Sequence, residues 1–245
     1  MKSFLFFSIT ILFTALHANM IEFLVDTKHY PSSVILMYRG LIGLVLCTAF
    51  AKIKKENAFP TKWNVQKYRL VNAGIIMLAV FESYKHLGAT TISLMQRMDI
   101  PLIVLLAIFY KERRSTFQNI MSVVTILFTC GFVYFQIITE EQHHSFTTSD
   151  WDGFMLISFA ALLLAINSRL VKKSVSTDNA FVITNITCIS TSVMGFITSL
   201  ATGKSFYINS NDYVWLVILT LLLIISYYFL VELYKIHLKY NVNYF

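Results

Sequence analysis

The chain has 245 residues, of which 56% are hydrophobic and 13% are charged, and its mean hydropathy is +0.64. Soluble domains carry roughly 25% charged residues, so this composition excludes a soluble domain and indicates an all-α polytopic membrane protein. The net charge of +7 does not indicate a nucleic-acid partner. The lysines and arginines lie in short segments between apolar spans, where they set the orientation of the chain in the lipid bilayer.

Apolar stretches of roughly 20 residues, long enough to cross a bilayer as helices, follow one another along the whole chain. We count about eight, at residues 4–25, 33–51, 68–86, 90–110, 118–139, 151–171, 180–202 and 213–235. The connections are mostly short, so no soluble domain is predicted. The first stretch begins like a cleavable signal peptide, but apolar residues resume at Met20, and we interpret it as an uncleaved helix.

The positive charges alternate between loops. Most lie after the second, fourth, sixth and eighth spans: Lys52, Lys54, Lys55, Lys62, Lys67, Lys111, Arg113, Arg114, Lys172, Lys173, Lys235 and Lys239. The other loops carry Lys28, Lys204 and an acidic segment at 140–150. Because cytoplasmic loops are rich in Lys and Arg, we expect a multi-pass protein of the plasma or inner membrane with both termini in the cytoplasm.

Two pairs of similar short segments indicate an internal repeat. Glu82-Ser83-Tyr84-Lys85 is matched by Glu232-Leu233-Tyr234-Lys235 at an offset of 150, and Ala18-Asn19 by Ile166-Asn167 at an offset of 148. In each case the two copies end spans that run in opposite directions, which predicts an inverted repeat of the kind that transporters use. The first unit is then residues 1–148, with five helices, and the second is residues 149–245, with three.

Polar residues inside the spans are the candidate binding residues. The span 90–110 carries Gln96, Arg97 and Asp99 at about the middle of a ~30 Å apolar core, followed by Pro101, which predicts a bend in the helix. A charge at that depth costs about 3 kcal/mol or more unless it has a partner. Two interpretations stay open: a polar wall lining a substrate cavity, or an internal pair of Arg97 with a carboxylate that fixes helix packing.

The first two spans add three further candidates. Arg39 lies in the first half of the second span, where its side chain either reaches the outer headgroups or faces a cavity. His17 and Asn19 lie on the first span and could bond to other helices or to a substrate.

The charged ends of the third and eighth spans have two interpretations as well. Glu82 with Lys85, and Glu232 with Lys235, are spaced three residues apart and can form ion pairs on one helix face. Such pairs either stabilise the helix ends at the membrane boundary or form part of an outer and an inner gate.

No enzyme activity, metal or cofactor is expected. The three cysteines, Cys47, Cys130 and Cys188, all fall inside apolar spans and show no metal-ligand spacing. The sequence has no phosphate-binding glycine loop, no Ser-His-Asp pattern and no carboxylate pair placed for glycosidic chemistry.

The stretch Tyr84–Gly131 resembles EamA-type members of the drug/metabolite transporter superfamily. The resemblance rests on Lys85–Leu94, Pro101 in mid-span, the helix end Leu106–Ser115, Gln118, Cys130–Val133 and the pair Tyr38-Arg39. It implies two inverted five-helix units that move a small polar or amphipathic metabolite by alternating access. Arg97 would hold an anionic group of the solute and Asp99 a cationic one.

This chain departs from the family's ten-helix plan. At an offset of 150, Phe245 corresponds to Met95, so equivalents of the last two helices are absent from the sequence. One alternative is therefore a truncated or split-subunit protein that needs a second copy or a fragment to supply the missing helices. Another is a nucleotide-sugar carrier of the same superfamily, serving an endomembrane.

Overall fold

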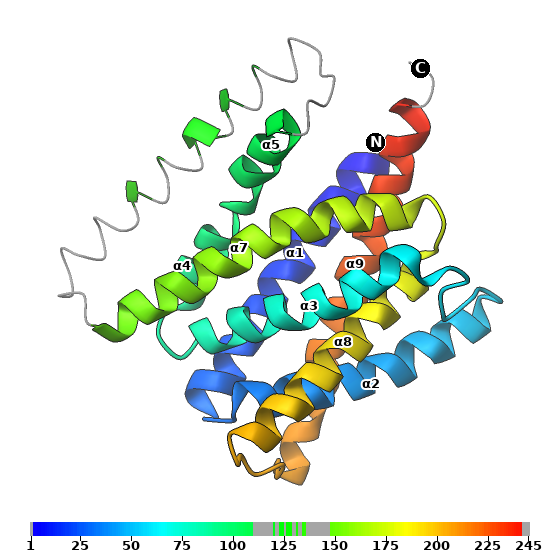
Figure 1. Ribbon diagram of the computed structural model, residues 1–245. Coiled ribbons are helices and arrows are strands. Elements are labelled where there is room, and N and C mark those ends of the chain that lie inside the picture. Colours follow the sequence, from blue (N-terminus) through cyan, green and yellow to red (C-terminus); the bar gives the residue numbers. More distant parts are fainter. Residues whose placement is uncertain are drawn as a thin grey trace.

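The computed structural model describes residues 2–109 and 148–241, with a few short pieces between 120 and 135 (Figure 1). Its elements are α1 (Lys2–Glu22), the π-helix η1 (Phe23–Thr27), α2 (Ser32–Ile53), α3 (Trp63–Ser83), α4 (Ala89–Gln96), α5 (Asp99–Phe109), α7 (Thr148–Val175), α8 (Ala180–Ala201), the short 3-10 helix η2 (Ser210–Asp212) and α9 (Tyr213–Asn241). Most of the predicted fifth span, 118–139, and most of the charges at 111–114 and 140–150 lie outside the described residues.

The prediction of an all-helical, membrane-embedded chain is confirmed in its coarse form. Six helical segments of the described part are long and apolar enough to cross a membrane: Phe4–Thr27, Ser32–Ile53, Ala89–Phe109, Asp150–Val175, Ala180–Ala201 and Ser210–Ile236. The predicted third span forms α3, but it is not among the six. Its polar groups, among them Arg69 and Asn72, make it less apolar, and it lies between α7 and α8 (Figure 1). The count of eight spans is therefore not confirmed.

The predicted span 90–110 is interrupted. Helix α4 ends at Gln96, α5 begins at Asp99, and Arg97 and Met98 form a turn between them. Pro101 is thus the third residue of α5 and not the centre of a bent helix. A proline ring clashes with the carbonyl four residues earlier, here that of Arg97. In the first turn of a helix the missing N–H has no intrahelical partner to lose.

Helices α2 and α8 approach each other most closely. A Cβ atom built on Gly40 would lie 2.5 Å from the Cys188 carbonyl oxygen, and one on Gly195 would lie 2.6 Å from the Met37 amide nitrogen. Glycine at these positions lets the two backbones come into contact, which is how membrane helices gain packing energy. Around this pair, α3 packs on α7 and α8, α1 packs on α9, α9 also contacts α2, and α4 and α5 lie on α7.

The helices define two ends of the bundle (Figure 1). The start of α1, the α2–α3 and α7–α8 connections and the end of α9 lie at one end, which we call the termini end. The α1–α2, α3–α4 and α8–α9 connections lie at the other, which we call the opposite end. Most of the described lysines gather near the termini end, at Lys52, Lys54, Lys55, Lys62, Lys67, Lys172, Lys173 and Lys235.

Candidate functional site

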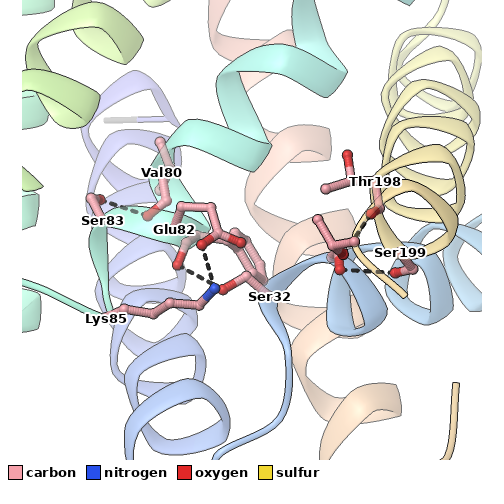
Figure 2. Close-up of polar contacts among 10 residues, drawn as sticks. Ser32, Val80, Glu82, Ser83, Lys85, Thr198 and Ser199 are labelled. Carbon is pink, nitrogen blue, oxygen red and sulfur yellow. Dashed lines mark hydrogen bonds and ion pairs between the residues drawn. The ribbon is translucent and has the colours of Figure 1, made fainter. Parts of the chain in front are cut away.

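The two predicted ion pairs both form, at opposite ends of the bundle. Lys85 contacts the Glu82 carboxylate at the opposite end (Figure 2), and Lys235 Nζ lies 2.8 Å from Glu232 Oε1 toward the termini end. The side-chain exposures are the same in both pairs, 38% for the lysine and 29% for the glutamate. Ion pairs as exposed as these contribute about 1 kcal/mol or less to stability, which is consistent with pairs that stabilise helix ends. Their role as gates stays a prediction.

Hydroxyl groups bond the carbonyls in the last turn of α3. Ser83 Oγ donates to the Val80 carbonyl at 2.7 Å, and Ser32 Oγ, from the start of α2, donates to the Phe81 carbonyl at 3.1 Å (Figure 2). Ser33 Oγ and Ser199 Oγ join α2 to α8 at 2.8 Å. These bonds satisfy polar groups that no water would reach within a membrane, and they fix the first turn of α2.

The polar residues of the span 90–110 lie at the break between α4 and α5. Gln96 ends α4 and is partly buried, Asp99 begins α5 and is also partly buried, and the Arg97 side chain is exposed. The structure therefore sets Arg97 apart from the packed interior. Its proposed contact with a solute stays a prediction.

Arg39 and His17 come together inside the bundle. The Arg39 side chain is fully buried, and its Nη1 lies 3.2 Å from His17 Nε2 on α1. A guanidinium group donates hydrogen bonds and cannot accept them, so Nε2 is the acceptor and the ring is neutral, with its proton on Nδ1. The Phe81 ring of α3 covers one face of the guanidinium, with its centroid 4.9 Å from Cζ.

The other two nitrogens of the Arg39 guanidinium make no hydrogen bond to the described residues. Its Nε and Nη2 atoms are buried and have no hydrogen-bond partner among the described residues. Arginine stays protonated in proteins, and burying a charge without partners costs several kcal/mol. Arg39 is therefore a fully buried cation in which three of the five N–H donors, those on Nε and Nη2, have no partner among the described residues, and this makes it a candidate binding feature.

Arg69 is a second buried arginine, which the sequence prediction missed. Its Nη1 donates to Gln66 Oε1 at 2.9 Å, and its Nη2 donates to the Ile183 carbonyl at 3.2 Å and contacts Thr187 Oγ1 at 3.4 Å. Gln66 Nε2 in turn donates to Asp178 Oδ2 at 2.7 Å. This network joins α3 to α8 and links the arginine to a carboxylate through one amide.

A signal for Arg69 was present in the sequence. Gln66, Arg69, Ala73, Ile76 and Val80 recur at helical spacing and are all buried, so Arg69 continues the apolar face of α3.

Asn19 and its predicted counterpart have different surroundings. Asn19 is exposed and donates to the carbonyl of Ala15 on its own helix at 3.1 Å, whereas Asn167 is buried. The structure does not bring Asn19 to Arg39. Near the same end of α1, Glu22 has a role that sequence reasoning did not assign: its Oε1 accepts from the Ala89 amide at 2.8 Å and caps the start of α4.

A polar cluster closes the opposite end. Asp212 accepts a hydrogen bond from the Tyr30 hydroxyl at 2.7 Å and lies 3.1 Å from Lys28 Nζ, and the same hydroxyl accepts from the Asn209 amide at 3.2 Å. Burial and the hydrogen bond to Asp212 raise the pKa of Tyr30. The cluster ties the α1–α2 turn to the start of α9.

Neither a metal site nor a known family emerges. No group of three metal-ligating side chains comes together among the described residues. No family model and no curated protein matches the chain. A solved structure described only as "Crystal structure of protein" is similar, with a TM-score of 0.61 and 13% sequence identity, covering 92% of this chain and 79% of that chain. At this identity the likeness shows the fold alone.

Proposed function

We propose that this chain is a membrane transporter of the drug/metabolite class, which moves a small polar or amphipathic metabolite by alternating access. The observation that carries the proposal is the fully buried Arg39, whose Nε and Nη2 donors have no partner among the described residues. Ionisable groups inside membrane helices are expensive and mark solute or ion pathways. A solute that accepts hydrogen bonds from this edge would offset the cost of burying the cation.

The helix contacts support an inverted repeat. In such a repeat, α1 corresponds to α7, α2 to α8 and α3 to α9. The contact of α1 with α9 then corresponds to that of α7 with α3, and the contact of α2 with α9 corresponds to that of α8 with α3. All four contacts are present. The paired helices run in opposite directions: α1 runs away from the termini end and α7 runs toward it (Figure 1). This is the relationship expected of two inverted halves that rock around a central site.

Because α2 and α8 correspond to each other, an exchange of the two halves maps their contact onto itself. The α2–α8 contact would therefore lie on the pseudo-two-fold axis that relates the two halves. Both helices have 22 residues, and they start at Ser32 and Ala180, 148 positions apart. Gly40 and Cys188, which touch, are also 148 positions apart. Arg39 is the neighbour of Gly40, so the buried cation would lie beside the axis, where transporters with inverted repeats bind their solute.

The lysine-rich termini end is proposed to face the cytoplasm. Cytoplasmic loops carry an excess of Lys and Arg, and the described lysines gather near that end. A cysteine placed at Lys54, in the α2–α3 loop, should react with an impermeant maleimide only after the membrane is opened. A cysteine at Lys204, in the α8–α9 loop, should react in intact cells.

Transport is tested with the purified full chain in proteoliposomes. The vesicles are incubated in a cell-extract metabolite mixture, washed, and their contents compared by mass spectrometry with those of empty vesicles. Accumulation of one or a few polar metabolites is expected. Well-folded protein that enriches no compound above the empty vesicles would contradict a solo transporter and favour the split-subunit alternative.

A further inference from the structure

We infer that the solute bound at this site is a carboxylate, held by two parallel hydrogen bonds on the Nε–Nη2 edge of Arg39. The inference deepens the proposed function and rests on it for placing the solute at Arg39. Four features of the described residues carry it: the missing counter-charge, the shape of the free edge, the neutral His17, and the separate use of Arg69.

Arg39 lacks a counter-ion among the residues that the structure describes. Among the described residues, its guanidinium bonds to His17 and lies against the Phe81 ring, and Cys188 and Tyr227 are near enough to affect it electrostatically. His17 is neutral in this arrangement, and the other three carry no negative charge in their ordinary states at neutral pH. The ion pairs that join Lys28 to Asp212, Lys85 to Glu82 and Lys235 to Glu232 do not involve Arg39. Among the described residues, no carboxylate neutralises Arg39, and a bound anion would supply the missing charge.

The free donors have the geometry of a bidentate site. Nε–H and one N–H of Nη2 are parallel and lie on the same edge of the planar group, which matches the two oxygens of a carboxylate. The other two sides are taken: His17 bonds to Nη1, and the Phe81 ring covers a face. A ligand must therefore approach in the plane of the guanidinium from the Nε side, which favours a flat carboxylate over a rounder group.

The charge balance also favours a carboxylate over a phosphate. Arg39 supplies a single positive charge, and neutral His17 adds none. A monovalent carboxylate would neutralise the site, whereas a phosphate dianion would leave excess negative charge in an apolar interior, which is strongly unfavourable.

Arg69 does not compete for the same ligand. Its Nη1 and Nη2 are already bonded to Gln66, Ile183 and Thr187. Its buried Nε has no partner among the described residues, but Nη2 on the same edge is taken, so a bidentate carboxylate would have to displace bonds that the protein makes. Arg69 fastens α3 to α8, whereas both Nε and Nη2 of Arg39 lack a partner among the described residues. The two buried arginines of this bundle thus have distinct tasks.

The binding test uses the full chain in phosphatidylcholine nanodiscs, which contain no carboxylate lipid. The thermal midpoint is followed with increasing sodium acetate, acetamide, sodium phosphate or sodium chloride at constant ionic strength. A ligand that binds only the folded state raises the midpoint. Acetate should raise it in a saturable way, acetamide and chloride should not, and phosphate should have a smaller effect. An equal or larger effect of phosphate, or no effect of acetate, would overturn the inference; this comparison requires no variant.

Three variants locate the binding. R39Q should abolish the acetate effect, and R39K, which keeps the charge but loses the bidentate edge, should weaken apparent affinity by about tenfold or more. K204Q removes one positive charge from an exposed position and should bind acetate like the unmodified chain. Acetate stabilisation that persists undiminished in R39Q or R39K would place the anion elsewhere and overturn the assignment.

Failure of this inference and failure of transport are distinguishable. Acetate binding is measured on protein at equilibrium and needs no solute movement. Proteoliposomes that accumulate only uncharged or cationic metabolites, together with no acetate effect, would leave the transporter proposal standing and remove the carboxylate. Arg39-dependent acetate binding without accumulation of any metabolite would leave the anion site standing and remove transport by this chain alone.

Discussion

Gly40 on α2 lies directly against the backbone of Cys188 on α8: a Cβ atom at position 40 would come within 2.5 Å of the Cys188 carbonyl oxygen and 2.6 Å of the Ser192 amide nitrogen. Backbone atoms of a packed helix cannot move aside as the end of a long side chain can. The position of Arg39, one residue before Gly40, therefore depends on how closely α2 and α8 pack.

The first prediction concerns this contact. G40A should push α2 away from α8 and reduce stability by about 1–3 kcal/mol, the usual effect of overpacking a tight interior. The measurement is the thermal midpoint of the purified protein in nanodiscs. G88A is the matched control, because a Cβ there meets only Glu22 Oε1 at 3.6 Å. Equal midpoints for the two variants would show that the helices do not pack as described.

The second prediction concerns the network of Arg69. Q66L leaves Arg69 Nη1 and Asp178 without the amide that joins them, and should cost about 1–3 kcal/mol, as expected for buried polar groups that lose a partner. Adding R69M should recover much of the loss, because an apolar side chain of similar length removes the unpaired buried charge. Additive losses in the double variant, measured by chemical or thermal unfolding, would contradict this interpretation.

The third prediction concerns the start of α4. E22A removes the acceptor for the Ala89 amide and should weaken the first turn of α4 by about 1 kcal/mol, a typical value for a lost N-cap. Hydrogen exchange of the amides at 89–92 should then accelerate by about fivefold. E22Q, which keeps an oxygen acceptor, should show a smaller change, and D26N, at an exposed position of η1, should show none. Unchanged exchange in E22A would remove the cap from the account.

The fourth prediction concerns the cluster at the opposite end. D212N removes the charge that pairs with Lys28 and weakens the acceptor for Tyr30. Amide exchange of residues 206–212 should become several-fold faster, since the α8–α9 connection loses part of its tie to the α1–α2 turn and keeps the bond from the Asn209 amide to Tyr30 and the bond from Tyr38 to the Phe206 carbonyl. D152N is the control: it removes an acidic charge from an exposed position at the same end of the bundle. Faster exchange in both variants would point to a general charge effect and not to this cluster.

Hydropathy predicted the long apolar helices. The spans of α1, α2, α7, α8 and α9 are close to the predicted ranges, because long apolar stretches have few alternatives to a membrane helix. Helix α3 was harder to classify, since it lies between α7 and α8 and its polar groups bond to neighbouring helices, as Asn72 Nδ2 does to the Leu163 carbonyl at 3.1 Å. Its role depends on partners far away in the sequence.

The candidate site could be predicted only in part. Arg39 and His17 were recognised as polar residues inside spans, but their contact joins two helices, and helical spacing on one segment does not reveal it. Arg97 attracted attention because it lies at mid-span, yet the break before Pro101 leaves its side chain exposed. A charge count along the chain could not distinguish an arginine at a helix break from one enclosed by packed helices.

The central claim is that transport depends on Arg39, and the most direct test compares arginine variants in one uptake assay. Proteoliposomes containing the unmodified chain, R39Q, R97Q or K204Q are supplied with the metabolite that the unmodified chain accumulates, and initial rates are measured at equal protein content. The account predicts that R39Q lowers the rate by at least tenfold, whereas R97Q and K204Q keep most of it. Uptake that survives in folded R39Q protein but disappears in R97Q would contradict the account and return the solute to the break between α4 and α5.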